Sequence, residues 1–188
     1  MNKVWKYSKN DRADGVLIMF IIAIPLFVLL LGFAININNS IQAKNEYNSM
    51  AQTSAQTSIK TINVNGGLGN GSIESFITEH RKQYMDGQPV SDQCKTMEID
   101  GVSRTLPYYV VTLETGRGLN GVNSTQSWVV EGTGTVPTKT LTNTKYSVLS
   151  AKVYTASTNI FGVFGLPSCQ LHASSVSAIA FGDKSDLS

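Results

Sequence analysis

The side chains with the most chemical potential in this 188-residue chain are two cysteines and two histidines. Cys94 and Cys169 lie far apart, and His80 and His172 have no adjacent nucleophile or ligand pattern. Structural zinc sites need clustered thiolates and imidazoles, so this spacing does not predict a metal centre. In an oxidising compartment the two cysteines predict one disulfide. The alternative is two independent buried thiols.

The acidic residues of the C-terminal part are scattered along the sequence. An enzyme needs an acid, base or nucleophile brought together in a defined constellation, and no Gly-x-Ser-x-Gly pattern is present. We therefore expect no catalytic site and no cofactor. The acidic residues considered are Glu74, Glu79, Asp86, Asp92, Glu98, Asp100, Glu114 and Glu131.

Charge argues against nucleic-acid binding. Charged residues make up only 15% of the chain and the net charge is +2, whereas duplex-binding domains usually present a basic face. Much of the positive charge lies at the extreme N-terminus, and the C-terminal two-thirds of the chain is rich in Ser, Thr, Asn and Gly. This composition is typical of exposed β-structure and turns.

Residues Val16 to Ile35 form an uninterrupted apolar run of the length that a helix needs to cross a membrane. Pro25 lies inside it, a defect that membrane helices tolerate. The sequence predicts a membrane anchor at 16–35, with the lipid bilayer as its partner. The anchor residues singled out are Val16, Phe20, Pro25, Leu29 and Gly32.

The charges that flank this run predict its orientation. Four basic residues precede it, whereas only Lys44 and then Lys60 follow. By the positive-inside rule, residues 1–15 are cytoplasmic and the remainder lies in the periplasm or at the cell surface. The alternative is a cleaved secretory signal peptide, for which Gly32 and Ala34 have the spacing that a signal peptidase reads.

Residues 36–62 contain no proline or glycine and predict a weakly amphipathic helix that continues the anchor. The two helical parts together would form a rod of about 70 Å. Small residues on its stripe favour close packing against a partner, against the chain's own domain, or both. The stripe comprises Ile37, Ile41, Lys44, Asn48, Ala51, Ala55, Ser58 and Ile62.

The remaining residues, 63–188, predict an α+β domain. A glycine-rich break is followed by a second helix from Ser72 to about Gly87, with His80 packed or solvated on one face. Period-two patterns then predict an antiparallel meander, with Asp100-Gly101 as the turn between its first two strands. The expected strands are Lys95–Ile99, Tyr108–Glu114, Ser127–Val136, Tyr146–Ala156 and Leu171–Phe181.

An apolar, glycine-containing loop precedes Cys169. Exposed loops of this kind often mark contacts with membranes or partner proteins, whereas the alternative is a loop that caps the core. Its apolar residues are Ile160, Phe161, Val163, Phe164 and Leu166.

The order of these features resembles the TadE/TadG-like pilus-assembly proteins of the Flp (Tad) pilus and secretion system. The resemblance rests on Asp14-Gly15 before the apolar run, on Pro25 within it and on Gly32–Ala34 near its end. It continues through the polar helix with Tyr47 and the AQTSAQTS stretch, and returns over Tyr146–Ile179. It therefore covers both ends of the chain, and the middle is compatible with it.

The resemblance implies a minor pilin or pseudopilin: a non-catalytic, pilin-like subunit that joins a filament or a homo- or hetero-oligomer. Its implied partners are other pilin-like subunits and pilus assembly platform proteins. Processed members of the family usually carry a Glu five residues after the cleaved glycine. After Gly15, the candidate processing site, that position is Phe20. This departure favours the unprocessed, TadG-like pattern, although the C-terminal half is more TadE-like.

A second function fits the same features. A membrane-anchored adhesin or sensor ectodomain could use the β-sheet and the 160–166 loop to bind a ligand or partner. A neighbouring gene for a secretion ATPase or prepilin peptidase would favour the pilin interpretation, and an isolated gene the adhesin or sensor.

Overall fold

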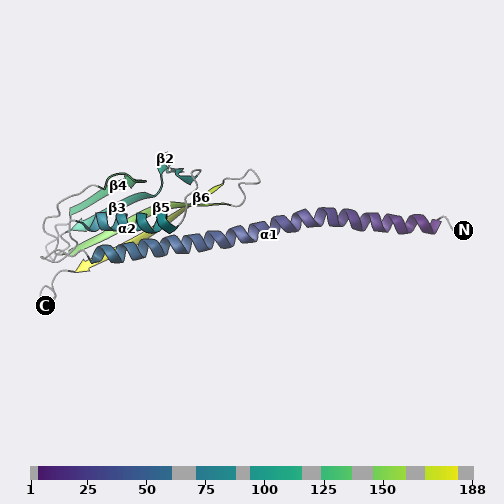
Figure 1. Cartoon of the computed structure of the whole chain (residues 1–188), viewed down its shortest axis with the longest axis horizontal. Coiled ribbons are helices and arrows are strands. Elements are labelled where there is room, and N and C mark those ends of the chain that lie inside the picture. The colour runs from purple at the N-terminus through teal and green to yellow at the C-terminus, as the bar shows by residue number, and fades with distance from the viewer. Residues whose placement is uncertain are drawn as a thin grey trace. The chain divides into compact units, whose positions relative to one another are not determined.

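The computed structural model describes residues 4–60, 71–87, 94–115, 124–136, 146–159 and 168–181. They confirm the α+β class, with a long N-terminal helix, a short second helix and two antiparallel sheets (Figure 1). The chain divides into two compact units, Met1–Asn39 and Ser40–Ser188. The elements are α1 (Val4–Ile59), α2 (Ser72–Gly87), β1 (Thr96–Ile99), β2 (Val102–Thr105), β3 (Tyr108–Thr115), β4 (Ser124–Glu131), β5 (Tyr146–Thr158) and β6 (Cys169–Phe181).

Helix α1 is continuous from the apolar run into the second unit, as the sequence predicts, and it includes Pro25. It is the one helix in the described part of the chain that is long and apolar enough to cross a membrane. Its apolar stretch is not covered by the other residues that the structure describes, and the Met19 side chain, for example, is 72% exposed. Such a surface needs lipid or other apolar helices around it.

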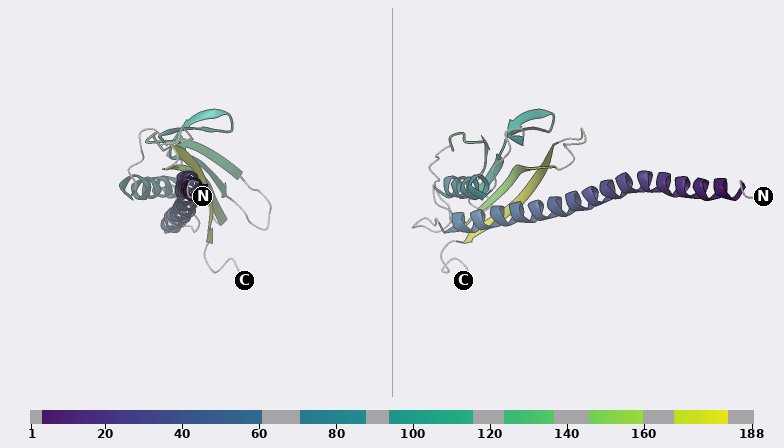
Figure 2. Two further views of the ribbon diagram at one scale, coloured as in Figure 1. Left: turned by 90° about the vertical axis from the view of Figure 1, so that its right-hand side faces the viewer. Right: turned by 45° about the vertical axis from the view of Figure 1, so that its right-hand side comes forward.

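In the second unit, α2 and the C-terminal part of α1 pack on one face of a four-stranded sheet (Figure 2). The strand order is β4-β3-β5-β6, and each neighbouring pair is antiparallel. The central strands direct mainly apolar side chains at the helices, with Thr155 of β5 as a buried polar exception, whereas the edge strands direct Gln126 and Ser174 toward the same side. The apolar residues of the central strands are Tyr109, Val111, Leu113, Leu149, Ala151 and Val153.

This strand order corrects the expected meander. In a meander β5 would pair with β4, but it pairs with β3 along eight residues. The physical reason is burial: placing β3 beside β5 brings the two most apolar strand faces together under the helices. The more polar strands are left at the edges.

The expected hairpin turn at Asp100-Gly101 is present, but the strand that follows it is Val102–Thr105 and not Tyr108–Glu114. The turn joins β1 to β2, and the strand at Tyr108 belongs to the other sheet. Asp100 and Gly101 have φ values of 52° and 77°, as a two-residue turn of the I′ type requires. Such a turn pairs the residues on either side of it directly, so the partner strand has to begin at Val102.

Strand β4 lies three residues earlier than expected at its start and ends at Glu131 instead of Val136. Gly132 ends the strand because its φ is +50°, a conformation that side-chain-bearing residues rarely adopt. A Cβ at this position would also lie 2.9 Å from Cγ2 of Thr105. The remaining predicted strands agree with the structure to within two residues at each end.

Candidate functional site

The residues singled out as the membrane anchor lie on the uncovered part of α1. Val16, Phe20 and Leu29 are more than half exposed, and Gly32 is partly exposed. Gly15 lies inside α1, and a Cβ placed on it would meet nothing within 4 Å. These residues form a surface for apolar surroundings and carry no group that could do chemistry.

Within the second unit, one face of α1 is buried. Three residues of the predicted small-residue stripe, Ala51, Ala55 and Ser58, lie on this face. Ile37, Ile41 and Lys44 of the same stripe are exposed and Asn48 is partly buried, so packing of the N-terminal part on a partner stays a prediction. Ile62 lies outside the described residues. The remaining buried residues of this face are Tyr47, Met50 and Ser54.

Serine can be buried on this face because the helix itself satisfies its hydroxyl. Ser54 Oγ donates to the carbonyl of Met50 at 2.7 Å, and Ser58 Oγ donates to that of Ala55 at 2.7 Å. Small side chains therefore line the interface between helix and sheet at no cost in unpaired hydroxyls.

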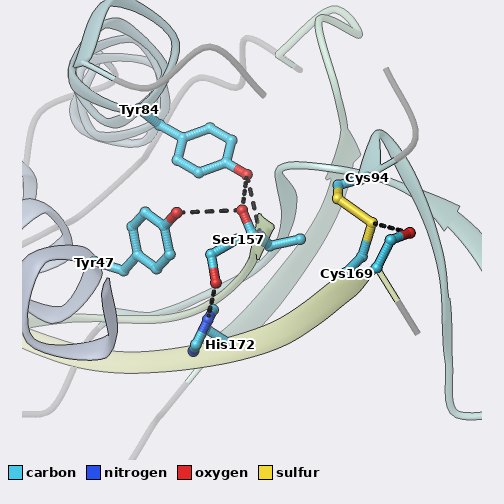
Figure 3. The surroundings of a disulfide bond; sticks show 8 residues. Tyr47, Tyr84, Cys94, Ser157, Cys169 and His172 are labelled. Atoms are coloured by element: carbon cyan, nitrogen blue, oxygen red, sulfur yellow. Dashed lines mark hydrogen bonds between the residues drawn. A yellow bond between two sulfur atoms is a disulfide. The ribbon is translucent and has the colours of Figure 1, made fainter. Parts of the chain in front are cut away.

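Two tyrosines fasten both helices to one point of β5, and we call Tyr47, Tyr84 and Ala156 the tyrosine clasp (Figure 3). Tyr47 of α1 and Tyr84 of α2 each donate to the Ala156 carbonyl, at 3.2 and 3.1 Å. The Ala156 N–H donates back to the Tyr84 hydroxyl at 3.1 Å. The two rings meet edge to face, with centroids 5.5 Å apart. Burial raises the pKa of both phenols, so both remain neutral donors.

The clasp is explained by the unequal lengths of the strands. β5 pairs with β3 only as far as Tyr154, whereas its pairing with β6 continues to Thr158. Ala156 therefore lies beyond the end of β3, with backbone groups that have no strand opposite them. The Tyr84 hydroxyl satisfies both of these groups, as a neighbouring strand would.

Below the clasp, β6 contacts α1 through polar side chains. His172 packs against the Tyr47 ring at 5.4 Å, and its Nε2 lies 2.7 Å from Ser157 Oγ. The Ser40 hydroxyl donates to the Gln170 side chain. Burial lowers the pKa of His172, and the nearby Lys44 lowers it further.

The Ser157–His172 pair has the elements of a nucleophile and a base, and the sequence did not reveal it because the residues are on separate strands. A working base also needs a group that orients its other ring nitrogen and a substrate within reach. His172 is 7% exposed and is packed under a helix. We interpret the contact as part of the interface.

His80 is fully buried on α2 among aromatic rings, so of the two expected roles, packed or solvated, the structure shows the packed one. Its Nδ1 lies 3.0 Å from the Tyr109 hydroxyl, and its ring stacks on Tyr84 and lies near Phe76. Its Nε2 has no hydrogen-bond partner among the described residues. Desolvation by burial lowers the pKa of His80 to about 4, so the ring is neutral at pH 7.

The structure contains the Cys94–Cys169 disulfide, with the two Cα atoms 5.6 Å apart (Figure 3). It belongs to a second apolar cluster on the sheet face opposite the helices, which includes Ile99, Tyr108 and Tyr154. The β1–β2 hairpin is held over this cluster by Arg104, which pairs with Glu131 at 2.8 Å and lies over the Tyr108 ring. The hydrogen bonds from the Thr105 N–H and Arg104 lower the pKa of Glu131.

The rest of that face is open and hydroxyl-rich. It holds a shallow hollow of about 390 Å³ with a single ammonium group, whose Nζ lies 4.9 Å from the centre of the Tyr154 ring. The side chains around the hollow include Val110, Thr112, Ser150, Lys152, Ser175 and Ser177.

Ile160, Phe161, Val163, Phe164 and Leu166, the predicted contact loop, lie outside the described residues. Within the residues that the structure describes, no three His, Cys, Asp or Glu side chains are grouped as a metal site would require.

Comparisons with protein-family models, with curated proteins and with solved structures find no match to this chain. The functional assignment therefore rests on the anchor, the tyrosine clasp and the disulfide.

Proposed function

We propose that this protein is a membrane-anchored, minor-pilin-like structural subunit of a Tad (Flp) type pilus or secretion assembly. The observation that carries the proposal is the two-part nature of α1. One continuous helix has uncovered apolar side chains over Val16–Ile35 and a buried face from Tyr47 to Ser58. The helix is thus both the membrane-seeking part and a core element of the second unit.

Such a helix suits a subunit that is anchored in an apolar environment and carries an exported domain. The tyrosine clasp joins α1 and α2 to the same carbonyl, and the disulfide closes the domain at the far side of the sheet. The order of features that resembles TadE/TadG-like proteins supports the same assignment. The proposed partners are the lipid bilayer, other pilin-like subunits and assembly platform proteins.

The proposal places the N-terminus in the cytoplasm and the domain outside it, because the basic residues precede the apolar run. It assigns no catalytic step to the protein. It also retains the anchor uncleaved, because Phe20 stands where processed members of the resembled family carry a Glu. The N-terminal residue of the mature protein tests this: Met1 or Asn2 supports an intact anchor, Val16 a pilin-type cut, and Ile35 a secreted protein.

The decisive experiment combines fractionation with a deletion strain. The full-length protein is expected to resist alkaline carbonate extraction of membranes and to be present in filaments sheared from the cells. Deleting its gene should reduce surface filaments, and the wild-type gene should restore them. A protein that washes off membranes contradicts the anchor, and filaments unchanged in number and composition contradict the structural role.

A surface adhesin or sensor is the second candidate, and the hollow on the open sheet face favours it. Thr112, Ser150 and Ser177 could hydrogen-bond a polar ligand there, with Lys152 beside them. A deletion strain that keeps normal filaments but loses attachment or a signalling response would favour this function over the pilin-like one.

A further inference from the structure

The four-stranded sheet has two edge strands, β4 and β6, which have no second strand partner in the described part of the chain. β6 is 13 residues long and contains no Lys, Arg, Asp, Glu or Pro. Natural sheets usually protect an exposed edge with charges, prolines or bulges, because free backbone groups pair readily with another strand. A long edge strand without such protective residues, as β6 is, indicates that another strand pairs with it.

The backbone groups that face outward on β6 follow from the hydrogen-bond pattern. The Asn159 N–H donates to the Ser168 carbonyl at 2.7 Å, so these two residues form a hydrogen-bonded pair just beyond the strands. Bonded and non-bonded pairs alternate in an antiparallel ladder. Ala173, Ser175, Ser177 and Ile179 therefore direct their N–H and C=O groups away from β5. Their side chains are exposed on the open face.

The outward backbone groups of β4 follow from the same alternation of bonded and non-bonded pairs. The Gly132 N–H donates to the Pro107 carbonyl at 2.9 Å, which fixes the alternation between β3 and β4. Thr125, Ser127 and Val129 therefore direct their backbone groups away from β3, and their side chains are exposed on the open face as well. The two edges thus present matching rows of outward donors and acceptors on the same face.

We propose that β6 of one copy pairs antiparallel with β4 of a second copy and joins their sheets edge to edge. This inference deepens the proposed structural role and rests on it. The three antiparallel pairings make β4 and β6 run in opposite directions. A second copy in the same orientation therefore offers β4 antiparallel to β6.

Side chains that lie opposite one another on neighbouring strands form rows across the open face, and these rows identify the register between the two copies. One row on the open face already runs through Ser127, Thr112, Ser150 and Ser177, with hydroxyl oxygens 3.2 Å apart at Thr112–Ser127 and 3.5 Å apart at Ser150–Ser177. Continuing this row places Ser177 opposite Ser127 of the second copy. Small hydroxyl pairs of this kind stabilise neighbouring strands.

The flanking rows are compatible with the same register. Ser175 meets Val129 of the second copy, and Ile179 meets Thr125, which is a β-branched pair. Glu131 of the second copy meets Ala173, so no like charges are opposed. Because the contact joins two different edges, it leaves one free edge of each kind and can be repeated. Strand twist turns each added copy relative to the last, which gives a helical array.

The test is site-specific photo-crosslinking of the full-length protein in native membranes. A benzophenone side chain replaces Val129, which is 54% exposed. Within one chain, β4 and β6 are separated by three strand spacings, or roughly 14 Å, so an adduct to β6 reports a second copy. We expect a dimer-sized adduct whose crosslinked peptide maps to residues 173–177. The same side chain at Val102, 47% exposed on the β1–β2 hairpin, is the control and should give no dimer-sized adduct to β6.

A pair of lysine variants separates edge pairing from general surface effects. Ser177→Lys puts a charge on the β6 edge, whereas Ser150→Lys puts the same charge on the neighbouring central strand. We expect Ser177→Lys to lose most of the adduct and Ser150→Lys to keep it. Equal yields in the two variants, or no adduct from Val129 to β6, would overturn the inference.

The two proposals fail in different ways. If the protein is present in sheared filaments but gives no Val129–β6 adduct, the edge contact alone is overturned. An adduct in cells whose filaments do not depend on the protein supports the contact and removes the pilin-like role.

Discussion

At the scale of single residues, the Tyr84 hydroxyl hydrogen-bonds the Ala156 N–H and C=O, which have no strand opposite them. The variant Tyr84→Phe keeps the ring but removes the acceptor of the Ala156 N–H and one of the two donors to its carbonyl. Leaving the buried N–H unpaired costs about 1–3 kcal/mol, and we expect a loss of that size in the free energy of unfolding. Tyr47→Phe should cost less, because it removes only one of two bonds to the same carbonyl. Urea unfolding of both variants measures the difference, and equal stabilities of Tyr84→Phe and wild type would contradict the clasp.

His80 makes stability depend on pH. Its pKa is about 4 in the folded protein and about 6.5 in the unfolded chain, so the unfolded chain binds more protons between these values. The stabilisation is complete above about pH 6.5 and is lost as the pH falls toward 4. A shift of this size corresponds to roughly 3 kcal/mol.

The measurement is urea unfolding at pH 7 and at pH 4.5. His80→Gln, which does not titrate, should lose less stability over this interval than wild type does. His172→Gln serves as the comparison, because burial and Lys44 lower the pKa of His172 as well and its effect has the same sign. If His80→Gln shows the wild-type pH dependence, the buried histidine is not its source.

At the scale of elements, the apolar part of α1 has a surface that water does not favour. Leu29→Lys places a charge near the middle of the run, which costs about 2.5–3.5 kcal/mol on membrane-insertion scales. We expect this variant to be largely removed from membranes by alkaline carbonate. Gln52→Lys adds the same charge to an exposed position beyond the run and should remain membrane-bound. Equal retention of both variants would count against a lipid- or helix-packed role for this face.

At the scale of the whole molecule, the disulfide ties the chain after α2 to the start of β6 across 75 residues. In the chain-entropy model, closing a loop of about that length is worth roughly 4 kcal/mol. For a unit of this size, that corresponds to a fall in Tm of about 8–16 °C. We expect this fall in Cys94→Ser, measured by thermal unfolding of the exported protein.

Cys169→Ser and the double variant are the controls for this experiment. Each removes the same bond, so the losses should be equal and not additive. Alkylation of both cysteines in non-reduced protein would contradict the bond. It would also weaken the extracytoplasmic assignment, because reduced thiols are typical of the cytoplasm.

The sequence alone determined those features that depend on local composition and period. The apolar run is recognisable by its length, its helical continuation by the absence of proline and glycine, and α2 by the periodic face that contains Phe76, Ile77 and Tyr84. The disulfide could be predicted because only two cysteines exist to pair. The strand at Val102 was missed, although the Asp100-Gly101 turn itself requires strands on both sides.

Only the tertiary structure decided how these elements combine. The strand order depends on which apolar faces share the helices, and neither face reveals its neighbour in the sequence. The tyrosine clasp at Ala156 exists because β5 extends beyond the end of β3. Local sequence patterns do not encode this difference in strand length. The outward rows on β4 and β6 follow from the pairing register, since a shift of one residue would turn every side chain and every backbone group to the opposite side.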